Sequence, residues 1–284
     1  SFANGITAVV PQLLVPFAAQ LATSEQRGSV VGTVMGGLLG GIVFSRIAGG
    51  FAGELLGWRS IFWIAAVFMV GLAIVLAQSL PKITSSVTLS YAALMRSLLG
   101  LLRQYPLLRE TSLMGGLFFS IYCGFWATLP FLLNNPPFEF GSQVAGLFGL
   151  VGIVGTLAAP TVGKIADRRS PRLTVGVAIV FLTLALLILW QLRTAIGGLL
   201  IGAMLLDLGV QTGQISNQTR IYSLPVEAHN RLTTVYMVSY FLGGSFGSWL
   251  GSYGWKVAGW TGVCAVGLAA TGIAVAIYHF GQKS

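Results

Sequence analysis

The sequence contains few charged residues and very few acidic ones. Of its 284 residues only 8% are charged and 7 are acidic, whereas about a quarter of an ordinary soluble domain is charged. With 55% hydrophobic residues and a mean hydropathy of +0.83, the chain cannot be an ordinary soluble domain. The composition therefore predicts a membrane protein that crosses the bilayer several times.

The sequence also lacks the residue patterns on which enzymes and metal proteins depend. Its two cysteines, Cys123 and Cys264, have no CxxC or His spacing around them, and its two histidines, His229 and His279, lie far apart. No Walker lysine loop is present, which argues against an ATP-driven pump. The net charge of +9 does not indicate nucleic acid, because the basic residues sit in short loops between apolar segments. We expect no enzyme activity, no cofactor, no metal and no nucleic-acid partner.

Nine apolar segments are long enough to cross a bilayer core of about 30 Å. If the loops alternate sides, twelve basic residues fall on one side and three on the other. The positive-inside rule makes the first side cytoplasmic, so residue 1 would lie outside and Ser284 inside. The predicted spans are 2–22, 30–53, 61–80, 113–133, 144–162, 173–192, 195–224, 232–253 and 257–278.

The first three predicted spans resemble the last three. Arg27 and the glycines and tryptophan that follow it recur around Arg231, 202 to 204 residues later. Because many transporters are built from repeated units, this pattern predicts a chain that lacks its first three helices. The expected domains are three helices of an incomplete N-terminal half (1–80), a cytoplasmic linker (81–110) and a six-helix C-terminal half (111–284). Residues 89–105 suit either an amphipathic helix at the membrane surface or a plain linker.

One predicted span carries a polar stripe. Asp207, Gln211, Gln214 and Gln218 follow one another at spacings of four, three and four, which places them on one helical face, and Asn217 is close by. A carboxylate at bilayer depth costs about 2.5 to 3.5 kcal/mol, so it normally faces a protein interior or a watery path. The stripe therefore indicates a solute or proton pathway, and interhelical glue is the alternative interpretation.

The fourth predicted span carries aromatic residues with polar tips. Tyr122 and Trp126 lie one turn apart, with Trp126 near the middle of the span. They suit an amphipathic wall for an organic solute, or else a belt at the membrane interface.

The loop GKIADRRSPR follows the fifth span. Its residues Gly163, Ala166, Asp167, Arg168 and Arg172 resemble the cytoplasmic signature loop GxLaDrxGrkxxl of the major facilitator superfamily, in the copy between helices eight and nine. That resemblance implies a gating role for Gly163, Asp167, Arg168 and Arg172. A basic turn that anchors the chain at the membrane surface is the alternative.

The second predicted span is similar to the antiporter motif of that family, G(x)8G(x)3GP(x)2GG. Gly32, Gly41, Gly49 and Gly50 match its glycines and imply close helix packing, while Ser45-Arg46 stands in place of Gly-Pro. Arg46 is therefore an arginine inside a span, and it either pairs with an acid or an anionic solute or extends to the lipid headgroups.

Together these motifs resemble helices 4–12 of a twelve-helix bacterial permease from the drug:proton antiporter-like branch. The resemblance implies an all-α polytopic membrane fold with nine transmembrane helices. It also implies a monomer in the bacterial inner membrane, with its C-terminus in the cytoplasm. The implied function is proton-coupled efflux or exchange of a small organic solute by alternating access. A truncated, non-transporting remnant and an uncoupled uptake facilitator are the alternatives.

Overall fold

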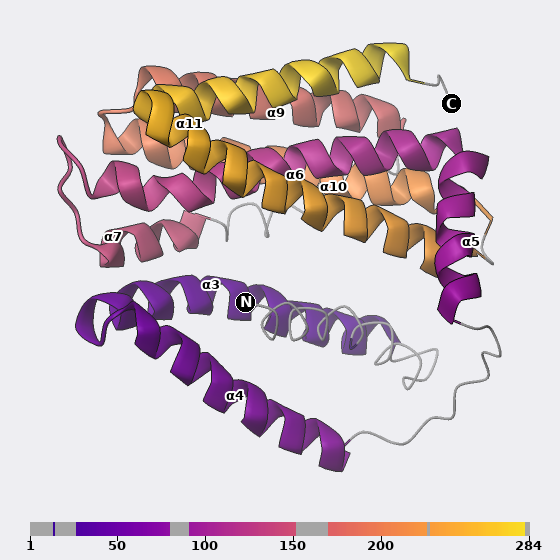
Figure 1. Ribbon diagram of the computed structural model, residues 1–284, viewed down its shortest axis with the longest axis horizontal. Coiled ribbons are helices and arrows are strands. Elements are labelled where there is room, and N and C mark those ends of the chain that lie inside the picture. The colour runs from indigo at the N-terminus through magenta and orange to yellow at the C-terminus, as the bar shows by residue number, and fades with distance from the viewer. Residues whose placement is uncertain (1–13, 15–26, 80–90, 152–169, 226–227, 282–284) are drawn as a thin grey trace. The chain divides into compact units, whose positions relative to one another are not determined.

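The computed structural model describes residues 14, 27–79, 91–151, 170–225 and 228–281, and within these ranges every regular element is a helix. Five of the described helices, α4, α6, α9, α10 and α11, are long and apolar enough to cross a membrane (Figure 1). An all-α polytopic membrane fold is therefore confirmed. The elements are α3 (Arg27–Leu55), α4 (Trp58–Ser79), α5 (Tyr91–Gln104), α6 (Pro106–Leu133), α7 (Ser142–Leu147), η1 (Phe148–Val151), α9 (Pro171–Gln191), α10 (Ile196–Ile221) and α11 (His229–Phe280).

The described helices follow the apolar segments closely. The predicted spans 61–80 and 173–192 correspond to α4 and α9, and the spans 113–133 and 195–224 correspond to α6 and α10. The span 2–22 and most of the span 144–162 fall outside the described residues. A total of nine transmembrane helices therefore stays a prediction.

α11 is two helices joined by a sharp turn. Its 52 residues contain non-helical backbone at Ala258 (φ −140°, ψ 21°) and Gly259 (φ 59°, ψ −144°). A positive φ is strained for most residues but not for glycine, so Gly259 permits the chain to reverse there. The two arms run back along each other, with Gly254 packed against Gly262, and form a hairpin in Figure 1. The turn lies two to three residues beyond the predicted boundary at 254–256, just inside the last predicted span.

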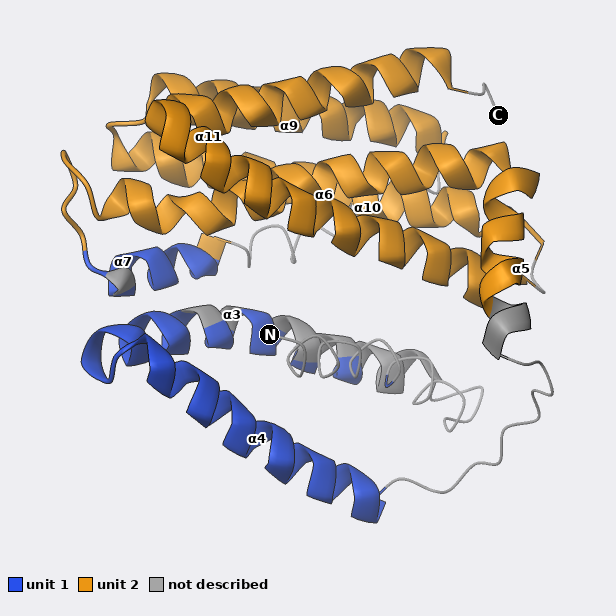
Figure 2. Ribbon diagram, viewed as in Figure 1, with its two compact units in different colours: residues 1–85, 141–150 blue, residues 86–140, 151–284 orange. Residues whose placement is uncertain are grey.

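The chain divides into two compact units (Figure 2). The first comprises residues 1–85 and 141–150, and within it the Glu54 carboxylate on α3 accepts a hydrogen bond from the backbone N–H of Gln143 on α7 at 3.1 Å. The second comprises residues 86–140 and 151–284 and contains α5, α6, α9, α10 and α11. The three-part division into 1–80, 81–110 and 111–284 stays a prediction.

Small residues bring α6 and α11 together. Gly116, Ser120 and Gly124 recur every four residues on α6, and they face Gly243 and Gly247 on α11. A Cβ added at Gly243 would overlap the backbone of Gly116, and one added at Gly247 would overlap the backbone of Ser120. In a bilayer, where apolar burial does not drive helix association, this close backbone approach stabilises the pair through van der Waals contact.

α10 packs against α9 through glycines. A Cβ added at Gly209 would lie 2.9 Å from Cγ of Leu182, and one added at Gly202 would lie 2.5 Å from Cγ of Leu189. Leu182 and Leu189 lie two turns apart on α9 and are both buried. The absence of side chains on this face of α10 therefore sets the distance between the two helices.

Most buried hydroxyls in the described helices bond to their own backbone. Thr128 donates to the carbonyl of Gly124 at 2.8 Å, Ser216 to that of Thr212 at 2.7 Å, and Thr271 to that of Gly267 at 2.9 Å. Such bonds satisfy a hydroxyl where no water is available, without any second helix. These residues therefore need no functional explanation.

α5 lies within the segment for which the sequence allows either an amphipathic helix or a plain linker. It is a helix, with Arg96 and Arg103 exposed and Leu101 buried. Leu101 belongs to one apolar cluster with Leu108 of α6 and Leu232 of α11. Apolar contact therefore holds α5 against α6 and α11, and its position at the membrane surface stays a prediction.

Candidate functional site

The polar stripe lies on α10 within the second unit. α10 is a regular helix from Ile196 to Ile221, so residues spaced by four, three and four share one side. Asp207 is only 4% exposed and Asn217 is fully buried. Gln211, Gln214 and Gln218 are half-buried. This side of the helix is opposite to the one that carries Gly202 and Gly209.

Tyr240 of α11 connects the stripe to the neighbouring helices. Its hydroxyl donates to Oε1 of Gln214 at 3.4 Å, and its ring stacks on that of Phe119 of α6, with centroids 4.1 Å apart and an interplanar angle of 17°. Asp207 and Tyr122 both lie close enough to Tyr240 to act on it electrostatically. Three residues that the sequence predicts, Asp207, Gln214 and Tyr122, are thus gathered around a tyrosine that it did not predict.

The aromatic residues of α6 form a continuous series. Tyr122 stacks on Phe119 with centroids 5.7 Å apart, and Trp126 lies 6.1 Å from Tyr122. All three side chains are half-buried, so each ring keeps part of its surface open. We call Phe119, Tyr122, Trp126 and Tyr240 the aromatic face. Rings with polar tips can contact an organic solute over a large area while they still offer hydrogen bonds.

A second tyrosine lies where α6, α10 and α11 meet. Tyr236 is fully buried, and its hydroxyl packs against Gly115, where an added Cβ would be 2.8 Å away. The Asn217 side chain lies beside this hydroxyl. The rings of Tyr236 and Tyr240 are 5.9 Å apart, so this polar contact continues from the aromatic face.

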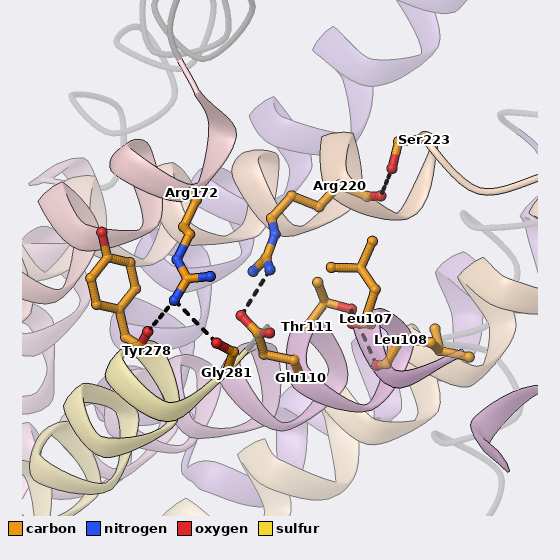
Figure 3. Close-up of polar contacts among 9 residues, drawn as sticks. All are labelled: Leu107, Leu108, Glu110, Thr111, Arg172, Arg220, Ser223, Tyr278 and Gly281. Atoms are coloured by element: carbon orange, nitrogen blue, oxygen red, sulfur yellow. Dashed lines mark hydrogen bonds and ion pairs between the residues drawn. The ribbon is translucent and has the colours of Figure 1, made fainter. Parts of the chain in front are cut away.

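A buried ion pair lies near Tyr236 and Asn217, where α10 ends and α6 begins. Nη2 of Arg220, in the last turn of α10, lies 2.8 Å from Oε1 of Glu110, in the first two turns of α6 (Figure 3). The two residues are 5% and 7% exposed. A buried pair of this kind requires good geometry, because each ion loses its hydration. From the sequence, Arg220 is one of the twelve basic residues assigned to loops on the cytoplasmic side. That interpretation is corrected here, because Arg220 lies in the helix and is buried.

Arg172 fastens the C-terminal end of α11 beside this ion pair. Its Nη2 donates to the carbonyls of Tyr278 at 2.6 Å and Gly281 at 3.3 Å, and its guanidinium lies 5.3 Å from the centre of the Tyr278 ring (Figure 3). An added Cβ on Gly281 would lie 2.6 Å from Oε2 of Glu110, so these contacts are continuous with the ion pair. The start of α9 is thereby tied to the end of α11.

Several predicted residues cannot be placed in this site. Gly163, Asp167 and Arg168 of the gating loop lie outside the described residues. Arg46 belongs to α3, but its side chain is not described, and the same is true of the surroundings of Gly32. For Gly41 and Gly49 an added Cβ would meet no described atom within 4 Å. The packing role of Gly32, Gly41, Gly49 and Gly50 therefore stays a prediction.

The sequence interpretation missed Tyr236, Tyr240 and the partner of Arg220. A signal for the tyrosines was present, because their spacing of four places them on one side of a span. A weaker signal for the ion pair was that Glu110 and Arg220 occur at span ends that the charge pattern places on the same side of the membrane. Neither signal identifies the facing helix.

Sequence comparison identifies the family. Residues 1–248 match the profile of the Major Facilitator Superfamily. The chain belongs to the major facilitator superfamily. The matched residues include α10 and the aromatic face, whereas Tyr278 and Gly281 lie beyond them.

Individual relatives agree with the family match. The chain is 40% identical over 264 residues to a protein named uncharacterized transporter YgaY from Escherichia coli O157:H7, over 93% of this chain and 67% of the relative. It is 31% identical over 259 residues to the probable transporter SCO4007 of Streptomyces coelicolor, over 91% of this chain and 60% of that relative. Membership in the major facilitator superfamily indicates a multi-pass membrane transporter rather than an enzyme.

Proposed function

We propose that the protein is a secondary active transporter that couples movement of a small organic solute to protons, in efflux or exchange. It acts as a monomer in the bacterial inner membrane, with its C-terminus in the cytoplasm. The observation that carries this proposal is the position of Asp207, which is buried in α10 beside half-buried amides and the aromatic face.

The chemistry of this site suits a solute and a proton together. Gln211 and Gln214 offer amide donors and acceptors, and Tyr122 and Trp126 offer ring surfaces that attract an aromatic or cationic solute. Asp207 takes up a proton when it faces one side of the membrane and releases it on the other. Because a charge at bilayer depth is costly, the solute and the proton influence each other's binding.

Alternating access requires elements that change their contacts between states. Arg172 is the described member of the predicted gating loop, and it already holds the C-terminal end of α11 through the carbonyls of Tyr278 and Gly281. In the proposed mechanism Gly163, Asp167 and Arg168 complete the latch, and Arg46 lies on the solute or proton pathway. The following test distinguishes this proton-coupled mechanism from the alternative, an uncoupled uptake facilitator.

The test is a proton-flux assay on the protein expressed from its complete gene and reconstituted into liposomes with an imposed pH gradient. A panel of aromatic cations and neutral metabolites is added, and internal pH is followed with a trapped dye. We expect at least one solute to dissipate the gradient with wild-type protein and with Glu139→Gln, a control at an exposed acid. Asp207→Asn should bind that solute without moving protons. Proton movement by Asp207→Asn would refute the coupling role and favour the facilitator.

A further inference from the structure

Buried polar atoms without a hydrogen-bond partner among the described residues gather near the C-terminal end of α10. They are Oδ1 and Nδ2 of Asn217, the hydroxyl of Tyr236, Nη1 of Arg220 and Oγ of Ser112. In native proteins such groups are few, and each one calls for an explanation. Oγ1 of Thr212, earlier on α10, is a further buried atom without such a partner, whereas Thr128, Ser216 and Thr271 bond to their own backbone.

The group lies beyond the polar stripe, toward the C-terminal end of α10. Asn217 and Arg220 follow Asp207 by ten and thirteen residues, so at 3.6 residues per turn they lie progressively further around the helix from the side of Asp207. Asn217 lies beside Tyr236, which packs on Gly115, and Ser112 is one turn earlier on α6. Arg220 follows Asn217 by one turn and pairs with Glu110. At a rise of about 1.5 Å per residue, the distance along α10 from Asp207 to Arg220 is about 20 Å. The stretch therefore covers much of a bilayer core of about 30 Å.

Leaving these groups unsatisfied would be costly. An unpaired buried donor or acceptor costs about 1 to 3 kcal/mol, and several together would consume much of the roughly 5 to 15 kcal/mol by which a protein is stable. Buried water, which typically makes about three hydrogen bonds, satisfies such groups in proteins. Asn217 is fully buried and lies beside the Tyr236 hydroxyl, and this single neighbour cannot satisfy both of its side-chain polar atoms, so Asn217 can still engage water.

We infer that a chain of buried water molecules runs along α10 from Asp207, past Gln214 and Asn217, to the ion pair of Glu110 and Arg220, and that it conducts protons. This inference rests on the proposed function, in which Asp207 takes up and releases a proton. Each water accepts a proton from one neighbour and passes its own to the next. One proton therefore leaves Asp207, one is released at the end of the unit where α6 begins, and the waters are unchanged.

The charged and titratable groups along the route suit this transfer. From α11, Tyr236 and Tyr240 present hydroxyls that can donate and accept, and from α6 Tyr122 lies close to Tyr240. At the far end the positive charge of Arg220 is neutralised by Glu110, so it presents no net barrier to a proton. Arg172 is engaged with the carbonyls at the end of α11.

The first test separates conduction from solute binding. Asn217→Leu keeps a similar volume but removes both polar atoms, whereas Asn217→Ser keeps a hydroxyl and leaves room for water. In reconstituted liposomes we expect Asn217→Leu to lose proton-driven solute accumulation and to keep solute-for-solute exchange without a pH gradient. Asn217→Ser should keep both activities. If Asn217→Leu retains proton-driven accumulation while Asp207→Asn loses it, the water route is refuted and the proposed function stands.

The second test looks for the waters directly in wild-type protein by X-ray radiolytic footprinting with mass spectrometry. Hydroxyl radicals form from bound water, so the fully buried Tyr236 should be oxidised rapidly, whereas Phe118, equally buried but packed on Gly213, should not. If Asn217→Leu loses both proton-driven accumulation and solute exchange, the labelling of Tyr236 in wild-type protein decides whether the water chain is present. Absence of labelling at Tyr236 would overturn the inference. If Asp207→Asn and Asn217→Leu both keep proton coupling, the proposed function fails and the inference fails with it.

Discussion

The two opposite faces of α10 differ in kind. One face presents Gly202 and Gly209 to leucine side chains of α9 and contains no polar side chain at these contacts. The other presents Asp207 and Gln214 toward α6 and α11, where Tyr240 meets Gln214. A single helix therefore combines a packing surface with a chemical one.

This difference shows how the protein holds in place a polar face that is energetically costly at bilayer depth. The glycine face lets α9 approach closely, and the small residues of α6 and α11 fix a second helix pair in the same way. Packing of this density tolerates little displacement. The polar face thus sits on a rigid support, as expected for residues retained for function rather than for stability.

The largest expected effect comes from breaking the buried ion pair at the C-terminal end of α10. Arg220→Met leaves Glu110 buried without its partner, and we expect a loss of about 3 to 5 kcal/mol in the free energy of unfolding. Equilibrium unfolding in mixed micelles measures it. The double variant Arg220→Met with Glu110→Leu should recover most of the loss, since it removes both buried charges. A single variant as stable as wild type would show that the pair is not buried.

The next effect concerns the glycine face. Gly209→Val places side-chain atoms where Leu182 already lies 2.9 Å from the position of the new Cβ, so we expect a loss of about 1 to 3 kcal/mol. Gly197→Ala is the matched control on the same helix, because its Cβ would meet no described atom within 4 Å. The same unfolding measurement compares them. Equal stability of both variants would contradict the packing role assigned to this face.

A smaller effect on stability is expected at the contact between α9 and α11. Trp260 of α11 is buried, and its Nε1 donates to the carbonyl of Leu189 at 2.8 Å. Trp260→Phe removes this hydrogen bond, and we expect a loss of about 0.5 to 1.5 kcal/mol. Trp249→Phe, at a residue that is 60% exposed, should change stability little. A larger loss for Trp249→Phe would argue against this arrangement of α9 and α11.

The smallest effect on stability is expected on the aromatic face. Tyr240→Phe removes a long hydrogen bond of 3.4 Å to Gln214 but keeps the stacking on Phe119, so the loss should stay below about 1 kcal/mol. Solute affinity, measured by tryptophan fluorescence quenching, should nevertheless fall several-fold. Unchanged affinity together with a large loss of stability would reverse the roles assigned to the two faces.

Much of the fold could be predicted because apolar length and glycine placement are local properties. The limits of α4, α9 and α10 follow from their apolar runs, and the turn at Gly259 interrupts one such run. Helix spacing likewise places Asp207 and Gln214 on one side of α10. No long-range information is needed for any of these.

The remainder depends on which distant helices meet. Tyr240 becomes part of the site because α11 crosses α6 through glycines more than a hundred residues apart in sequence. From the sequence alone Arg220 resembles a loop cation. The structure pairs it with Glu110, 110 residues earlier in the chain. The proposed roles of Arg46, Gly163, Asp167 and Arg168 remain predictions, because the described structure does not include the side chains that would test them.

The most direct test of the central claim, that one face of α10 lines a watery path, is cysteine scanning along this helix. In a background with Cys123→Ala and Cys264→Ala, single cysteines are introduced from residue 199 to 218 and labelled in membranes with a small water-soluble thiol reagent. We predict rapid labelling of Gln211→Cys, Gln214→Cys and Gln218→Cys, and slow labelling of Gly202→Cys and Gly209→Cys. Uniform labelling, or none on the Asp207 side, would contradict the account.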